Sequence, residues 1–235
     1  MTDFLLQLAL AVVPTVFAIT LHEAAHGYAA MALGDNTARD AGRLSLNPLR
    51  HVDRVGTIIL PGILLVTQLL LPPHKVQFMF GWAKPVPVDP WAFRDPRRGM
   101  AVVAAAGPAM NFALAWAAAV ALFAFQGKGL FDTLGFQFLF YFILSNLVLG
   151  LFNLLPIPPL DGGRIAVGVL PLPLAMAWAR MERAGIVIVL FVVFLLPYAT
   201  GFDPVGMALD HVLPWAFRTI LSLAGHDLGG HGRAL

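Results

Sequence analysis

Three kinds of residue are scarce in this chain of 235 residues, and each shortage narrows what the protein can be. Cysteine is absent, so the protein has neither disulfides nor metal sites built on thiolates. Charged residues make up only 12% of the sequence, far below their share in typical soluble domains. The glutamates are limited to Glu23 and Glu182. A bound metal would therefore depend on histidine, aspartate, one of these glutamates or backbone oxygen atoms.

Apolar residues dominate the rest of the chain. They make up 59% of the sequence, and the mean hydropathy is +0.79, which indicates an integral membrane protein. The net charge of +2 comes without a basic run interleaved with aromatic residues, which argues against nucleic acid as a partner. We predict a single integral-membrane domain over residues 1–225, followed by a glycine-rich, disordered tail at residues 226–235.

The apolar residues fall into stretches that approach the length needed to cross a bilayer, about 20 residues. These stretches are residues 4–33, 55–71, 100–125, 134–155, 184–198 and 205–224. Basic loops flank the second stretch on both sides, so we expect it to be re-entrant or interfacial rather than to cross once. The last stretch contains Asp210 and Arg218 and either spans or lies at the interface. The predicted fold is an all-α, multi-pass membrane protein with about 5–6 hydrophobic helices.

A proline-rich stretch, "FGWAKPVPVDP", lies between the second and third apolar segments. Aromatic and β-branched residues alternate there with proline, which favours an extended edge segment over a helix. We therefore predict a small membrane-associated β-element near residues 78–90, whose edge could accept a peptide by strand addition. On spacing alone, a connecting loop is the simpler interpretation.

The motif "HEAAH" stands inside the first apolar segment. On a helix, His22 and His26 share one face, and Glu23 adjoins them. This is the HExxH arrangement, in which two imidazoles bind zinc and the glutamate is the general base. Ionisable groups at membrane depth are costly and usually functional, so a purely structural role is a weak alternative.

A third metal ligand must come from elsewhere in the chain. The longer motif HExxHxxGxxH is excluded, because Ala32 stands where its third histidine would be. Asp161 is the best candidate, since it follows a long apolar helix within "NLLPIPPLDGG", where an isolated carboxylate is otherwise unexpected. The alternative is that Asp161 caps a short helix over residues 162–170.

Two asparagines extend this set of candidates. Asn111 lies in "AAAGPAMN" near the start of the third long apolar segment, and Asn153 lies eight residues before Asp161. One or both could donate a hydrogen bond to a developing oxyanion. Asparagines in membrane helices also bridge helices structurally, and this alternative stays open for both residues.

Four motifs, "HEAAH", "AAGPAMN", "GWAKPVPV" and "FNLLPIPPLDGGR", occur in an order that resembles the site-2 protease family of intramembrane zinc metalloproteases, peptidase family M50. The resemblance extends from about Phe17 to Arg164. The chain resembles the short, single-domain branch, because no segment is long enough for a PDZ or CBS domain.

The resemblance implies a zinc metalloendopeptidase that hydrolyses peptide bonds within or beside transmembrane segments of membrane proteins. It implies one zinc ion per chain bound by His22, His26 and Asp161, with Glu23 as acid/base and Asn153 near the metal as a substrate-binding or intermediate-binding residue. It likens "GWAKPVPV" to a β-element that presents substrate, and it places the active site toward the cytosolic side of a bacterial or archaeal-type cell membrane.

Two other functions compete with proteolysis. A membrane metal transporter would also bury histidine and aspartate in a helix bundle, but it would not specifically need a glutamate beside the first histidine. A proteolytically inactive relative that only binds membrane proteins is less favoured, because every expected ligand and the base are present.

Overall fold

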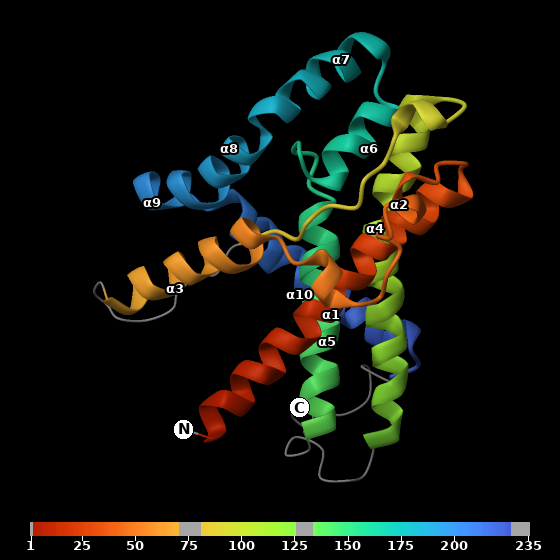
Figure 1. The fold of residues 1–235 in the computed structure, drawn as a ribbon. Coiled ribbons are helices and arrows are strands. Elements are labelled where there is room, and N and C mark those ends of the chain that lie inside the picture. The colour runs from red at the N-terminus through yellow and green to blue at the C-terminus, as the bar shows by residue number, and fades with distance from the viewer. Residues whose placement is uncertain (1, 71–80, 126–133, 227–235) are drawn as a thin grey trace.

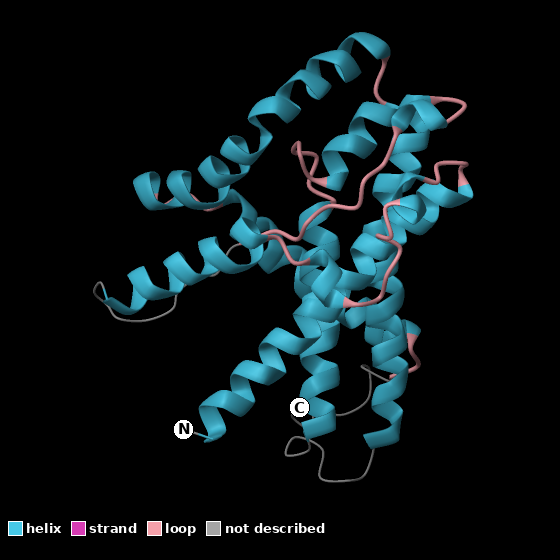
Figure 2. Ribbon diagram, in the orientation of Figure 1, coloured by secondary structure: helices cyan, strands magenta, loops and turns pink. Residues whose placement is uncertain are grey.

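Helices and the loops between them make up the whole described chain, residues 2–70, 81–125 and 134–226 of the computed structural model (Figure 2). The longer helices are α1 (Thr2–Ala32), α4 (Pro96–Ala121), α5 (Leu134–Asn153) and α10 (Pro204–Leu223). The shorter helices are α2 (Thr37–Asp40), α3 (Leu60–Leu70), α6 (Asp161–Val169), α7 (Leu172–Met181), α8 (Gly185–Leu190) and α9 (Leu196–Thr200). A π-helical turn precedes α3, and another joins α8 to α9.

Within the described residues, four helical segments are long and apolar enough to cross a membrane. They are Leu8–Ala32, Pro96–Phe125, Leu134–Asn153 and Leu172–Thr200. This agrees with an all-α, multi-pass membrane protein, but the predicted count of about 5–6 spanning-type helices is not confirmed. The segment expected at residues 184–198 begins earlier, at Leu172, and Arg54–Gln68 is apolar but shorter than a span.

The bundle core lies where α4, α5 and α10 pack against one another. On α4, Ala115 and Ala119 are fully buried, and they face the fully buried Ile143 and Leu147 of α5. Small side chains on one helix let a neighbouring helix approach closely, which is how membrane helices gain packing without a hydrophobic driving force. α1 packs against α4 and α5 at the same bundle (Figure 1).

The short helix α6 is held against the start of α4. The α4 end is well defined, because Pro96 occupies its first turn and the Asp95 side chain accepts hydrogen bonds from the first free amides. Arg97, in the same turn, donates to the carbonyl oxygen of Leu170 at 2.7 Å, directly after α6. A Cβ on Gly168 would overlap the Cβ of Ala101, so α6 and α4 are in close contact. This packing fixes the position of Asp161, the first residue of α6.

The predicted β-element near residues 78–90 is not confirmed. Residues 78–80 lie outside the described chain, and residues 81–89 form an extended loop without a strand. The backbone amides of this loop form isolated hydrogen bonds instead. The Trp82 amide donates to the Gly56 carbonyl at 3.1 Å, and the Lys84 amide donates to the His51 carbonyl at 2.8 Å. Pro85 and Pro87 have no amide hydrogens, so a regular ladder cannot continue.

The segment α7–α9 extends away from the bundle of α1, α4 and α5 (Figure 1). Only 11% of the most apolar 18-residue stretch within Leu172–Thr200 is buried. Most of its surface is therefore open to lipid or to another chain. Most of the predicted disordered tail, residues 227–235, lies outside the described chain. His226 is described, and its Nε2 lies 2.7 Å from the carbonyl oxygen of Ala119.

Candidate metal centre

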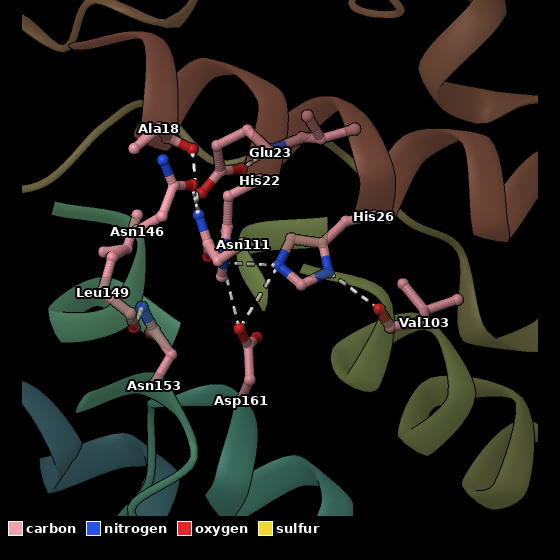
Figure 3. A network of polar contacts seen from close by, with 11 residues as sticks. Ala18, His22, Glu23, His26, Val103, Asn111, Asn146, Leu149, Asn153 and Asp161 are labelled. Atoms are coloured by element: carbon pink, nitrogen blue, oxygen red, sulfur yellow. Dashed lines mark hydrogen bonds and ion pairs between the residues drawn. The ribbon is translucent and has the colours of Figure 1, made fainter. Parts of the chain in front are cut away.

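The two histidines of "HEAAH" lie one turn apart on the face of α1 that meets α4 and α6 (Figure 3). Their rings are perpendicular, and their Nε2 atoms are 3.0 Å apart. Asp161 approaches the pair from α6: its Oδ2 is 3.1 Å from Nε2 of His22 and 3.4 Å from Nε2 of His26. The fold thus brings together the three side chains predicted as metal ligands.

The second nitrogen of each imidazole faces a hydrogen-bond acceptor. Nδ1 of His26 lies 2.7 Å from the carbonyl oxygen of Val103 on α4. Nδ1 of His22 lies 2.6 Å from Oδ1 of Asn111, also on α4. An oxygen of either kind can only accept, so Nδ1 carries the proton in both rings. Nε2 of each histidine therefore presents a lone pair toward Asp161.

The amide of Asn111 has its orientation set by its own partners. Its Nδ2 donates to the Ala18 carbonyl at 3.3 Å and to Oδ1 of Asn146 at 2.8 Å. Asn146 in turn donates its Nδ2 to the Phe142 carbonyl at 2.8 Å, which leaves its oxygen as the acceptor. This series of bonds therefore has one direction, and it ends with His22 as the donor to Asn111.

Three atoms that carry lone pairs thus face one another: Nε2 of His22, Nε2 of His26 and Oδ2 of Asp161. The Asp161 oxygen is buried and has no hydrogen-bond donor. Such a group is mutually repulsive unless a cation lies among its members. The separations of 3.0, 3.1 and 3.4 Å are close to the edge, about 3.3 Å, of a tetrahedron with metal–ligand bonds of about 2.0 Å. The donor set and its geometry fit zinc.

Helix α4 approaches the histidine pair at a glycine. A Cβ on Gly107 would lie 2.5 Å from Cε1 of His26 and 2.6 Å from Nε2 of His22, which is too close for any side chain. The glycine therefore lets the α4 backbone pack directly on the rings. Asn111, one turn further along α4, then reaches Nδ1 of His22.

The tight turn between α5 and α6 aims Asp161 at the histidines. A Cβ on Gly162 would overlap the carbonyl oxygen of Leu154, so the two segments lie in contact there. Leu160 occupies the N-cap position of α6, and no side chain caps this helix. The alternative that Asp161 serves as a helix cap is therefore wrong.

Glu23 is linked to the extended segment 81–89 rather than to the histidines. Its Oε2 accepts a hydrogen bond from the backbone amide of Val86 at 3.1 Å. Val86 lies between Pro85 and Pro87, which have no amide hydrogens. The Val86 amide is therefore the one backbone donor that this stretch of three residues can offer, and it is directed at Glu23.

The far end of segment 81–89 is tied to the end of α1 by Asp35. This buried carboxylate accepts hydrogen bonds from the amide of Asp89 at 2.8 Å and from the amide of Thr37 at 2.9 Å. Burial alone would raise the pKa of Asp35, but the hydrogen bonds from Thr37 and Asp89 hold the pKa below its ordinary value. The ionised carboxylate thus anchors the segment that contains Val86.

A cavity of about 840 Å³ opens beside the histidine pair. Its polar lining includes His22, Glu23 and Asn153, and residues 81–83 form part of its wall. Nδ2 of Asn153 donates to the carbonyl oxygen of Leu149 in its own helix at 3.0 Å. Most of the remaining wall is apolar and comes from α5 and from the part of the chain that runs from α8 into α10.

Comparison with known proteins places the chain in a family. A sequence model described as peptidase family M50 matches residues 134–196. Over 194 residues, 80% of this chain and 80% of the relative, the sequence is 38% identical to the "Putative zinc metalloprotease YwhC" of Bacillus subtilis. This chain belongs to peptidase family M50. The "Putative zinc metalloprotease Rip2" of Mycobacterium tuberculosis is 30% identical over 223 residues, 92% of this M50 chain and 75% of the relative. No solved structure matches.

The sequence reasoning did not anticipate three contributors to this M50 site. Asn146 lies fully buried in α5 without a motif around it, so only the packing reveals its contact with Asn111. Gly107 belongs to the motif "AAGPAMN", but the motif alone does not indicate its contact with the histidine rings. The sequence does indicate that the Val86 amide is distinctive, because the prolines on both sides leave it as the one backbone donor of residues 85–87.

Proposed function

We propose that this M50 protein is a zinc endopeptidase that cuts peptide bonds within or beside membrane-spanning segments of other membrane proteins. The observation that carries the proposal is the convergence of His22, His26 and Asp161 beside a cavity that His22 and Glu23 line. The names of the relatives support zinc as the metal. The apolar helices around the site support substrates that reside in the lipid bilayer.

His22, His26 and Asp161 are the three protein ligands that would hold one zinc ion per chain. Three ligands leave one position open, as in catalytic zinc sites. When bound, zinc supplies Lewis-acid chemistry: it acidifies water and polarises the scissile carbonyl. The Val103 carbonyl and the Asn111 oxygen keep both imidazoles in the tautomer that can bind metal.

Glu23 is the acid/base of the proposed reaction. Its carboxylate takes a proton from the attacking water and later gives that proton to the nitrogen of the leaving peptide. The hydrogen bond from the Val86 amide holds Oε2 in place. The carboxylate is therefore oriented before a substrate arrives, which removes part of the ordering that catalysis would otherwise require.

The two predicted asparagines have different contacts and, we propose, different roles. Asn153 lines the cavity together with Glu23, so it is the candidate to bind the substrate carbonyl and its developing negative charge. Asn111 is fully buried, and its amide is bonded to His22, Ala18 and Asn146. These contacts favour a positioning role for Asn111 over the predicted role as an oxyanion donor.

Substrate would enter the cavity as an unwound, apolar segment of a membrane protein. Residues 81–83 offer extended backbone at the cavity wall, and strand pairing with substrate is proposed there. Pairing would stop at Pro85 and Pro87, because these residues have no amide hydrogens. Basic residues concentrate in the loops at 34–54 and 72–99, which supports a site toward the cytosolic side.

The proposed activity is tested by looking for new protein N-termini in membranes from cells that produce the wild type or the His22→Ala variant. N-terminal labelling and mass spectrometry should find cleavage sites within or beside transmembrane segments only when the wild type is present. The His211→Ala variant, changed at an exposed histidine on α10, should behave as the wild type does. Identical sets of N-termini with and without His22 would overturn the proposal.

The Val86→Pro variant should lower kcat by about 10- to 100-fold, because it removes the amide that orients Glu23. The flanking prolines already hold this stretch extended, so a further proline suits the backbone. Zinc content should not change, since neither Val86 nor Glu23 belongs to the ligand group. Steady-state kinetics should be compared with Val86→Ala, which keeps the amide and loses the same packing. Equal kcat values for the two variants would show that the amide has no such role.

A further inference from the structure

The buried asparagine in the middle of α5, Asn146, is outside the proposed ligand group and does not line the cavity. We infer that Asn146 is a positioning residue for the metal centre, which acts through Asn111 to keep His22 in its metal-binding tautomer. The inference rests on the proposed function, because it assigns a role toward the same zinc ion. It concerns metal affinity, however, and it can be tested without measuring proteolysis.

The burial of Asn146 is the first observation behind this inference. Asn146 and Asn111 are both 0% exposed, and both lie within helices long enough to cross a membrane. An amide at that depth is costly unless its hydrogen bonds are made, and such residues usually have a function. Asn146 satisfies its own donor on the Phe142 carbonyl at 2.8 Å, and its oxygen then accepts from Asn111 at 2.8 Å.

A purely structural contact between α1 and α5 already exists one residue away. The hydroxyl groups of Thr15 and Ser145 lie 2.9 Å apart and join these two helices. The ring nitrogens of His22 contact Asn111, His26 and Asp161, and neither hydroxyl belongs to that group. The Asn146 contact differs, because it leads through a single side chain to a nitrogen of a proposed zinc ligand.

The direction of the Asn111 amide decides whether His22 can bind metal. With Oδ1 toward His22, as observed, Nδ1 donates and Nε2 has a free lone pair. With the amide reversed, its NH2 group would face Nδ1, which would then have to accept, and the proton would move to Nε2. A protonated Nε2 cannot coordinate a metal ion.

Of the two acceptors that the Nδ2 of Asn111 contacts, Asn146 is the nearer one, so it opposes the reversal most strongly. Its Oδ1 can only accept, so a reversed Asn111 would place oxygen against oxygen at this contact. The remaining partner, the carbonyl of Ala18, is more distant, at 3.3 Å. The orientation of Asn146 itself follows from the Phe142 carbonyl in its own helix. The backbone of α5 thus sets the tautomer of a histidine on α1.

The test is the zinc affinity of the purified full chain, measured in detergent by competition with a chromophoric chelator. Asn146→Leu, which has a similar volume but no amide, should weaken zinc binding by about 10-fold, the lower end of the effect of losing a direct partner of a metal ligand, because Asn146 acts through Asn111. Asn146→Asp should restore most of the affinity, because a buried, protonated carboxyl group can donate to Phe142 and accept from Asn111. Ser145→Ala is the matched control and should bind zinc as the wild type does.

A double-mutant cycle separates positioning from general destabilisation. If Asn146 acts through Asn111, then Asn146→Leu should have no further effect on zinc affinity in an Asn111→Ala background. An unchanged affinity for Asn146→Leu, or an equal loss in both backgrounds, would overturn the inference. A wild-type chain that binds no zinc would overturn the proposed function, and the inference with it.

Discussion

The Glu23→Gln variant is expected to lose peptide-bond hydrolysis while it keeps its zinc. Glutamine has the shape of glutamate, and its carbonyl oxygen can still accept the hydrogen bond from the Val86 amide. It cannot take a proton from water at neutral pH, so the general-base contribution, about 10²- to 10⁴-fold in rate, should disappear. The ligand group contains His22, His26 and Asp161 but not Glu23, so metal binding should be unaffected.

Cleavage by this variant should be measured with a substrate found through its new N-terminus, and zinc should be measured on the same sample. Glu182→Gln is the matched control, because Glu182 is the other glutamate of the chain and forms an exposed ion pair with Arg164. Such pairs contribute little, so this variant should be as active as the wild type. Full cleavage activity in Glu23→Gln would contradict the role of Glu23 as the acid/base.

The Gly107→Ala variant is expected to lose zinc binding although it adds only one methyl group. The new Cβ would lie 2.5 Å from Cε1 of His26 and 2.6 Å from Nε2 of His22, so the rings or α4 must move. Overpacking of this kind costs about 1–3 kcal/mol in stability. The larger effect should be on the metal, with at least about a 100-fold loss of zinc affinity, because displaced Nε2 atoms no longer match the coordination distances.

Gly62→Ala is the appropriate control for this substitution. Gly62 lies in the apolar helix α3, and a Cβ there would meet no atom of the described residues within 4 Å. This variant should have wild-type zinc affinity and activity, measured by chelator competition and by cleavage of the same substrate. If Gly107→Ala also binds zinc normally, α4 does not pack on the histidines as described.

The grouping of the three proposed metal ligands was predictable because their chemistry depends on local geometry and on few candidates. The helical repeat alone places His22 and His26 on one face. Asp161 could be found by elimination, since the chain has no cysteine and its second glutamate lies beside two arginines. What the sequence could not show is that the Asp161 carboxylate leaves its own helix end uncapped and turns to the histidines.

The supporting contacts were not predictable in the same way, since they depend on how helices are rotated against one another. Nothing in the sequence around Asn146 indicates that its oxygen meets Asn111 on another helix. The Pro85-Val86-Pro87 pattern was interpreted as the edge of a β-element. In the structure, the missing amides of these prolines prevent a ladder and leave the Val86 amide for Glu23.

The most direct test of the account is elemental analysis of zinc in the detergent-purified wild type, His22→Ala and Asp161→Ala. The account predicts about one zinc ion per chain in the wild type and a strong loss in both variants, because α1 and α6 contribute ligands to the same ion. Asp40→Ala, at an exposed aspartate of α2, should retain zinc. Full zinc content in Asp161→Ala would contradict the account, since Asp161 would then not be the third ligand although its carboxylate faces both histidines.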